Sequence, residues 1–157
     1  MTIDPRTGAL TLDDGTRLDP DYARDEFLSS DHAKRGREGV QNEPWSSWVV
    51  PEVKAGGKSW KAMLCFSDGQ LGMLDLVLQA PEFGCGWQDH SAEKERARKK
   101  AHDAWLESEL GPPASVEALV STWTLEGCEV LSLHDKRTAA SAINVRFGWE
   151  KDDGEEE

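Results

Sequence analysis

The clearest pattern in the chain is a pair of segments in which apolar and polar residues alternate. A period of two is typical of a β-strand with one buried face. The apolar positions are Trp60, Ala62, Leu64 and Phe66 in the first segment and Gly72, Leu74, Leu76 and Leu78 in the second. Asp68-Gly69 lies between the segments and favours a two-residue turn. The pattern therefore predicts an antiparallel hairpin over residues 60–78.

Shorter runs predict further strands on both sides of this hairpin. Alternation around Asp13-Asp14-Gly15 predicts a first hairpin over 9–18. A short strand over 48–50 should end at Pro51, because proline has no amide proton for a sheet. Strands are also predicted over 123–125, 129–133 and 142–149. The polar segment 31–43 lacks periodicity and contains Gly36 and Gly39, which predicts a loop.

A long helix is predicted from Ser91 to Leu110. Ser91 can cap the free amides of the first turn, and Gly111 followed by two prolines ends the helix. A second, short helix is predicted within residues 22–29, with Phe27 and Leu28 facing inward. The expected buried stripe of the long helix is Ala97, Ala101, Ala104 and Trp105, and its expected solvated side carries Lys94, Arg96, Arg98, Lys99 and Lys100.

Together these elements predict an α+β fold. A mostly antiparallel sheet of about six strands should carry the long helix on one face. Residues 1–149 fit a single α+β domain, and residues 150–157 are predicted to be an acidic, disordered tail. No apolar run approaches the roughly 20 residues needed to cross a bilayer, and the first ten residues hold no apolar stretch. We therefore expect a cytoplasmic protein without a membrane partner.

The charge balance indicates which class of molecule the protein can bind. The formal net charge is −12, and residues 150–157 hold six acids and one lysine, so residues 1–149 carry −7. An acidic body repels nucleic acid and attracts basic proteins, although acidity can also serve solubility alone. We expect a basic protein partner and no nucleic acid.

The sequence holds few signs of catalysis. The histidines and cysteines show no spacing typical of a metal site, and no glycine-rich phosphate loop is present, which predicts a protein without metal or cofactor. The three cysteines, Cys65, Cys85 and Cys128, are expected to be reduced thiols. Cys85 and His90 share a loop and His134 closes a strand, so a small enzyme that uses these three residues is one alternative. Because no catalytic signature surrounds them, we predict a protein that is not an enzyme.

Tryptophan is unusually frequent, with seven in 157 residues. Trp60, Trp105, Trp123 and Trp149 lie on apolar stripes or in strands and are expected in the core. The other three lie in or beside loops, where they either anchor the loop or form an exposed aromatic surface of the kind enriched at binding hot spots. The predicted partner-binding residues are Trp45, Trp48, Trp87, Glu43, Glu82 and Asp89.

The arrangement of several segments along the chain is similar to that of a known kind of protein. These segments are residues 3–16, 24–28, 42–45, 81–84 and 102–106, together with the terminal hairpin. In this layout the chain resembles small bacterial immunity proteins that neutralise polymorphic or type VI secreted toxins. The resemblance implies a protein that masks the active site of a cognate toxin and has no activity of its own. We expect a monomer or weak dimer. A secretion chaperone or adaptor, which would usually be dimeric, is the main alternative.

Overall fold

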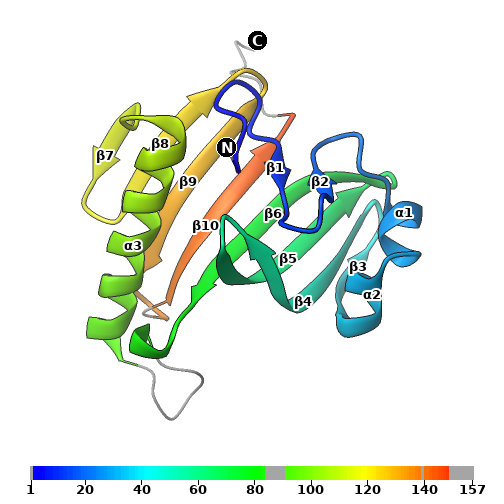
Figure 1. The fold of residues 1–157 in the computed structure, drawn as a ribbon, viewed down its shortest axis with the longest axis horizontal. Coiled ribbons are helices and arrows are strands. Elements are labelled where there is room, and N and C mark those ends of the chain that lie inside the picture. Colours follow the sequence, from blue (N-terminus) through cyan, green and yellow to red (C-terminus); the bar gives the residue numbers. More distant parts are fainter. Residues whose placement is uncertain (1, 84–90, 139, 149–157) are drawn as a thin grey trace.

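The computed structural model describes residues 2–83, 91–138 and 140–148. They form an α+β fold around an eight-stranded antiparallel sheet with the order β3-β4-β5-β6-β10-β9-β8-β7 (Figure 1). Its strands are β3 (Arg37–Asn42), β4 (Trp45–Ala55), β5 (Lys58–Ser67), β6 (Gln70–Gln79), β7 (Ser115–Glu117), β8 (Val120–Leu125), β9 (Cys128–Asp135) and β10 (Ala140–Phe147). A separate hairpin consists of β1 (Leu10–Thr11) and β2 (Arg17–Leu18). The helices are α1 (Arg24–Leu28), α2 (Asp31–Arg35), η1 (Pro81–Phe83) and α3 (Ala92–Leu110).

The central hairpin predicted from the alternation is confirmed as β5 and β6. Its turn residues Asp68 and Gly69 have φ angles of 53° and 83°, which is the left-handed backbone that a tight hairpin turn requires. One detail differs from the predicted stripe. Cys65 pairs with Met73 and Phe66 pairs with Leu71, so the strand bulges at Gly72. The bulge places Leu71, in place of Gly72, in the core.

Two predicted boundaries are wrong. Residues 31–43 are not a loop, because they form α2 and the edge strand β3, which pairs with β4. The strand predicted over 48–50 extends from Trp45 to Ala55. Pro51 does not end β4, because the register shifts between Val50 and Val53 and the proline lies in this bulge, where no ladder hydrogen bond is needed.

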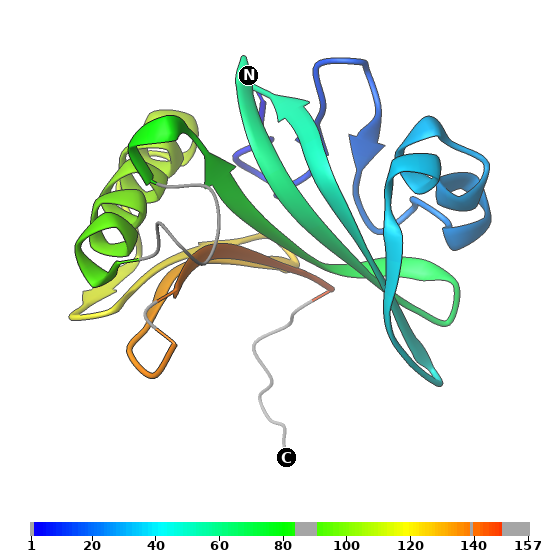
Figure 2. The same ribbon diagram turned by 90° about the horizontal axis from the view of Figure 1, so that it is seen from below.

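All the helices and the β1–β2 hairpin contribute to one hydrophobic core on one face of the sheet. At one end of this core, the Phe27 ring of α1 lies 5.7 Å from Trp48 and 5.6 Å from Phe66. At the other end, Trp105 of α3 packs on Trp60 with ring centroids 4.6 Å apart. Figure 2 shows α3 above the strands β8, β9 and β10, whose lower side carries no helix of the described part. The expected inward orientation of Leu28 is wrong, because this side chain is exposed.

The opposite face of the sheet, which we call the open face, faces away from this core. Pairing aligns Val49, Met63, Asp75, Asn144 and Leu131 in one row across five strands. Most side chains of this row and its neighbours are only partly buried. Cys65 and Leu131 are buried but do not belong to the hydrophobic core cluster. The sheet thus has one covered face and one face that is apolar but uncovered by the described residues.

The ends of the long helix are confirmed, and so are the burial of Trp105 and the packing of Ala101 on the core, but the rest of the predicted stripe is wrong. Ser91 Oγ accepts a hydrogen bond from the amide of Lys94, and Gly111 has a φ of 82° at the C-terminal cap. Ala97 and Ala104 are exposed, whereas Arg98 is buried. The buried residues of α3 are Glu95, Arg98, His102, Trp105 and Leu106. The helix is therefore packed largely through polar side chains.

None of the helices in the described ranges is long and apolar enough to cross a membrane.

Trp105 should be a major source of the stability of α3. We expect Trp105→Ala to reduce the free energy of unfolding by about 3–5 kcal/mol, the usual effect of truncating a large core aromatic. Denaturant melts measure this loss. Ala104→Ser, next to it on the exposed side, should stay within about 0.5 kcal/mol of the wild type. A loss below about 1 kcal/mol for Trp105→Ala would show that the helix is held by other contacts.

Candidate functional site

The first candidate site is a polar cluster where α3 meets the sheet. Strands β6 and β10 pair from Met73↔Arg146 to Leu76↔Ile143, and the pairing stops there. In this register, Val77 would pair next with Ala142, and Leu78 would follow with Ser141. Figure 2 shows the two strands diverging at this point, with α3 beside the opening. The parting leaves main-chain groups of both strands without their strand partners.

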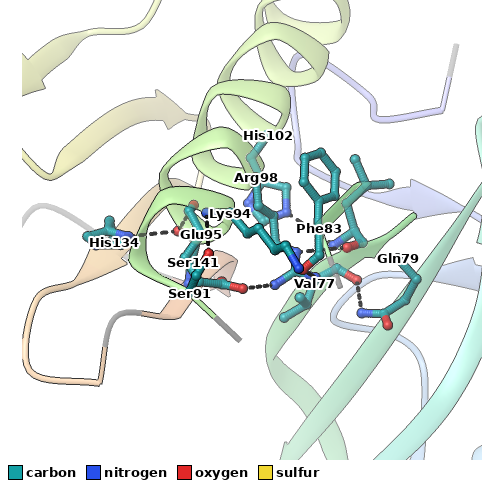
Figure 3. Close-up of polar contacts among 11 residues, drawn as sticks. Val77, Gln79, Phe83, Ser91, Lys94, Glu95, Arg98, His102, His134 and Ser141 are labelled. Atoms are coloured by element: carbon teal, nitrogen blue, oxygen red, sulfur yellow. Dashed lines mark hydrogen bonds and ion pairs between the residues drawn. The ribbon is translucent and has the colours of Figure 1, made fainter. Parts of the chain in front are cut away.

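Three side chains of α3 replace the missing strand pairing (Figure 3). The amide of Ser141 donates to Glu95 Oε1 at 2.9 Å. On the other strand, Arg98 Nε donates to the Leu78 carbonyl at 3.0 Å, and the Leu78 amide donates to His102 Nε2 at 3.1 Å. Residues 95, 98 and 102 share one face of a helix, so a single helix can bond both parted strands. We call Glu95, Arg98 and His102 the polar wedge.

The two charges of the wedge compensate each other. Arg98 forms an ion pair with Glu95, and both side chains are buried. The Arg98 guanidinium also lies 5.4 Å from the centre of the Phe83 ring, which ties η1 to the helix. Buried ions are tolerated only when they are paired and their remaining hydrogen-bonding groups are satisfied. The Glu95–Arg98 pair meets this condition through the main chain of the sheet, whereas the buried His102 Nδ1 has no hydrogen-bond partner among the described residues.

His102 is neutral in this arrangement. Because Nε2 accepts from the Leu78 amide, the ring proton lies on Nδ1. The ring stacks on Trp60 with centroids 5.9 Å apart and is fully buried. Burial, together with the positive charges of Arg98 and Lys99, lowers the pKa of His102 to about 3. The imidazole acts here as a hydrogen-bond acceptor within the fold.

Beside the wedge, His134 and Ser141 are close enough to suggest a nucleophile and a base. Ser141 Oγ donates to the Glu95 main-chain carbonyl at 2.6 Å and lies 2.9 Å from His134 Nδ1. A hydroxyl has one proton, so His134 Nδ1 must donate to Ser141 and does not act as its base. Ser141 is 2% exposed. We interpret this pair as an attachment between β9, β10 and α3.

The predicted alternative site of Cys85, His90 and His134 cannot be placed, because Cys85 and His90 lie outside the described residues. Within the described ranges, no three His, Cys, Asp or Glu side chains gather as metal ligands. The two described cysteines are free and buried, as predicted. Burial raises the pKa of Cys65 to about 11 and that of Cys128 to about 12, so both are protonated thiols at neutral pH.

A hollow of about 670 Å³ lies between the β1–β2 turn, α2 and the bulge of β4. His32 lies at its wall, with Nε2 3.0 Å from Asp14 Oδ2 and Nδ1 3.0 Å from the Arg35 guanidinium. At the opposite wall, Lys54 pairs with Glu52 at 3.2 Å. Since these polar groups already bond one another within the chain, we assign the hollow a structural role.

The structure separates the predicted partner-binding residues. The prediction that Trp48 is a surface residue is wrong, because its ring packs on Phe27 and Phe66 in the core. Trp45 and Glu43 share the β3–β4 turn region and are exposed. Glu82 is also exposed, but it lies in η1 beyond the other end of β6. Register places Trp45 opposite Ser67 and Gln79 opposite Ser59, so the length of β5, roughly 25 Å, separates these ends. Trp87 and Asp89 lie outside the described residues.

Trp45 belongs to the open face. Its side chain points to the same side of β4 as those of Ser47 and Val49, and Ser47 pairs with Cys65 on that face. Its ring lies over Gly72, where a Cβ would be 3.5 Å from the ring, and 46% of the residue is exposed. The Trp45 ring therefore lies in contact distance of the β6 bulge, whose next residue is Met73. The open face therefore has an aromatic residue at one end of an apolar strip.

A chain of polar contacts crosses the middle of this strip. Asn144 Nδ2 donates to Asp75 Oδ1 at 2.6 Å, and Arg146 Nε donates to Asn144 Oδ1 at 2.7 Å. Arg146 also pairs with Glu129 at 3.5 Å. The sequence interpretation did not identify Asp75 or its methionine neighbours as site residues. The available signal was that Met63, Met73 and Val77 make the second face of the central hairpin apolar as well.

No protein-family model matches the sequence, and comparisons with curated proteins and with solved structures found no match. The interpretation of both sites therefore depends on their geometry and chemistry.

The wedge should be essential for folding. Arg98→Met would leave Glu95 as a buried, unpaired charge and the Leu78 carbonyl without its partner, so we expect a loss of about 3–5 kcal/mol of unfolding free energy. Arg96→Met, on the exposed side of the same helix turn, should change it by less than about 0.5 kcal/mol. Urea melts of both variants provide the comparison. Equal stabilities would contradict the role assigned to the wedge.

His102 should make the protein sensitive to mild acid. The unfolded chain binds a proton at this histidine near pH 6.5, whereas the folded protein does so only near pH 3, so stability is lost as the pH falls through this window. The expected loss between pH 6.5 and 5 is about 2 kcal/mol, at about 1.4 kcal/mol per pH unit. His102→Gln keeps an acceptor for the Leu78 amide and should flatten the curve in this range. Equal slopes for the two proteins in urea melts would refute this assignment.

Proposed function

We propose that the protein is a protein-binding inhibitor of the immunity kind, which holds a basic partner on the open face of its sheet. The observation that carries this proposal is the open face itself, an apolar strip with an exposed tryptophan that no described element covers. Large apolar patches on soluble domains commonly mark interaction sites. The layout resembling immunity proteins supports the choice of an inhibitor among binding proteins.

The side chains of the open face suit a protein partner. Trp45 buries a large area with little loss of conformational freedom, which is why tryptophan dominates many interfaces. Met63 and Met73 are flexible and polarizable, and such residues adapt to the shape of a partner. Arg146 and Glu129 provide polar groups beside the apolar strip. An aromatic residue, methionines and a limited polar set are typical of an interface core with its rim.

Much of the negative charge lies in the N-terminal segment. Residues 1–31 hold eight acids and three bases, so they carry −5 of the −7 in residues 1–149. Its last part, residues 21–31, with four acids and one base, is attached to the same end of the sheet as Trp45, because Ala23 bridges to Gln70 and the Arg24 amide donates to the Gly69 carbonyl. Asp13, in contrast, accepts from the amides of Gly56 and Gly57 at the opposite end. A basic partner would be attracted to the N-terminal segment first, which mainly raises the association rate.

A secretion chaperone of the kind considered above would use such a face differently. It would bury the open face in a stable dimer or bind an extended segment of an effector. The molecular mass in solution separates the two functions, because the proposed inhibitor is a monomer or weak dimer.

Trp45→Ala should weaken the partner complex without unfolding the protein. We expect a loss of about 2–4 kcal/mol of binding free energy, mainly as faster dissociation, because an anchoring tryptophan is a typical hot spot. Dissociation rates are measured with the cognate partner, identified by pull-down with the wild-type chain, at low and high salt. Val116→Ala, which removes another exposed apolar side chain on β7, is the control and should dissociate like the wild type.

If Trp45→Ala and a charge placed in the strip, Val49→Glu, both dissociate at the wild-type rate, the open face is not the binding face. If the inhibitor function is correct, co-expression of the wild-type chain should also suppress the toxicity of the captured partner, and co-expression of Trp45→Ala should do so less well.

A further inference from the structure

Resting on the proposed function, we propose that Asp75 is the receptor for a cationic side chain of the partner, in particular an arginine. Asp75 lies at the middle of the open face, in the row between Met63 and Asn144. Met73 and Val77 flank it along β6 on the same face. This carboxylate therefore has apolar side chains beside it on two strands, with Asn144 opposite it and Lys61 and Arg146 one position further along the neighbouring strands.

Within the described residues, no cation forms a direct ion pair with this carboxylate. Its one hydrogen bond with the described residues comes from the neutral amide of Asn144. Arg146, the cation of this network, bonds to Asn144 and pairs with Glu129 instead. Burial raises the pKa of Asp75, and the Asn144 bond and Arg146 oppose this only in part. The unbound protein thus leaves a partly desolvated acid with spare acceptor capacity on an uncovered face.

A partner on this face would remove the remaining water from Asp75. A carboxylate buried without a counter-ion is strongly unfavourable, so a well-matched partner must bring a cation or a strong donor to it. Arginine fits best, because its planar guanidinium donates several hydrogen bonds and its aliphatic stem can pack against Met63 and Met73. Trp45 on the same face adds an aromatic surface for a second basic side chain. The basic partner expected from the net charge agrees with this chemistry.

The chain offers a direct readout, because its three methionines are Met1, Met63 and Met73. Met63 and Met73 flank Asp75, and the Met1 signal is the reference against which their shifts are compared. The experiment labels the methionine methyl groups with carbon-13 and follows them by NMR during titration with a capped hexa-arginine peptide at about 0.15 M salt, where surface charges are screened beyond about 8 Å. We expect the Met63 and Met73 signals to shift with saturation while the Met1 signal stays in place. A capped hexa-lysine peptide should bind more weakly.

Asp75→Asn preserves the shape of the side chain and the contact with Asn144, and we expect at least a tenfold weaker response. Glu107→Gln removes an exposed acid of α3 and should leave the Met63 and Met73 response unchanged. Dispersed methyl signals and an unchanged melt verify that each variant is folded. An equal response of Asp75→Asn and wild type would overturn the proposal, as would peptide binding that shifts neither internal methionine.

A concentration-dependent shift of both methionines without peptide would also overturn it, since the occupant of the face would then be a second copy of the chain. These outcomes are distinct from a failure of the proposed function. If Trp45→Ala releases the cognate partner while Asp75→Asn does not, the face binds protein but the cation receptor is wrong.

Discussion

The fold depends on how α3 closes the gap between β6 and β10. A sheet that parts along one line exposes main-chain donors and acceptors, and burying them unbonded would cost several kcal/mol. Glu95, Arg98 and His102 meet this requirement from one helix face, so the helix is both the cover of the core and the missing hydrogen-bonding partner of two strands. Polar residues at these positions are therefore a condition of the topology.

This constraint explains where sequence interpretation succeeded and failed. The β5–β6 hairpin was predictable because its turn and its alternation are both local. The ends of α3 were predictable for the same reason, since capping depends on residues next to the helix. The buried face of α3 was not, because Arg98 is buried only when two strands distant in sequence leave a carbonyl and an amide to be bonded. A prediction from the spacing of apolar and charged residues alone places an arginine on the solvated side of the helix.

The residues of the candidate site were likewise predictable from the sequence only in part. Trp45 was identified from its type and its position beside a loop, and the structure places it, exposed, on the open face. Trp48 has the same local signals but faces the core, because side chains three residues apart on a strand point to opposite faces. Segment 37–42 became a strand through pairing with β4 and through Ser47 Oγ, which accepts from the Val40 amide at 2.9 Å. Neither contact is visible in the segment itself.

The two faces of the sheet thus have separate tasks. The covered face contains the wedge and the aromatic core, and it provides stability. The open face lies outside the hydrophobic core cluster, and in the proposed function it binds the partner. In our proposal, Asp75, which has no direct ion pair within the described residues, receives its counter-ion from the partner.

The most direct test of the open face as the binding face is hydroxyl-radical footprinting of the chain alone and in complex with its cognate partner, read by mass spectrometry. The account predicts that oxidation of Trp45, Met63 and Met73 falls together on binding, while the exposed side chains of α3 are oxidised as before. Protection confined to α1, α2 or η1, with unchanged oxidation of the two methionines, would contradict it.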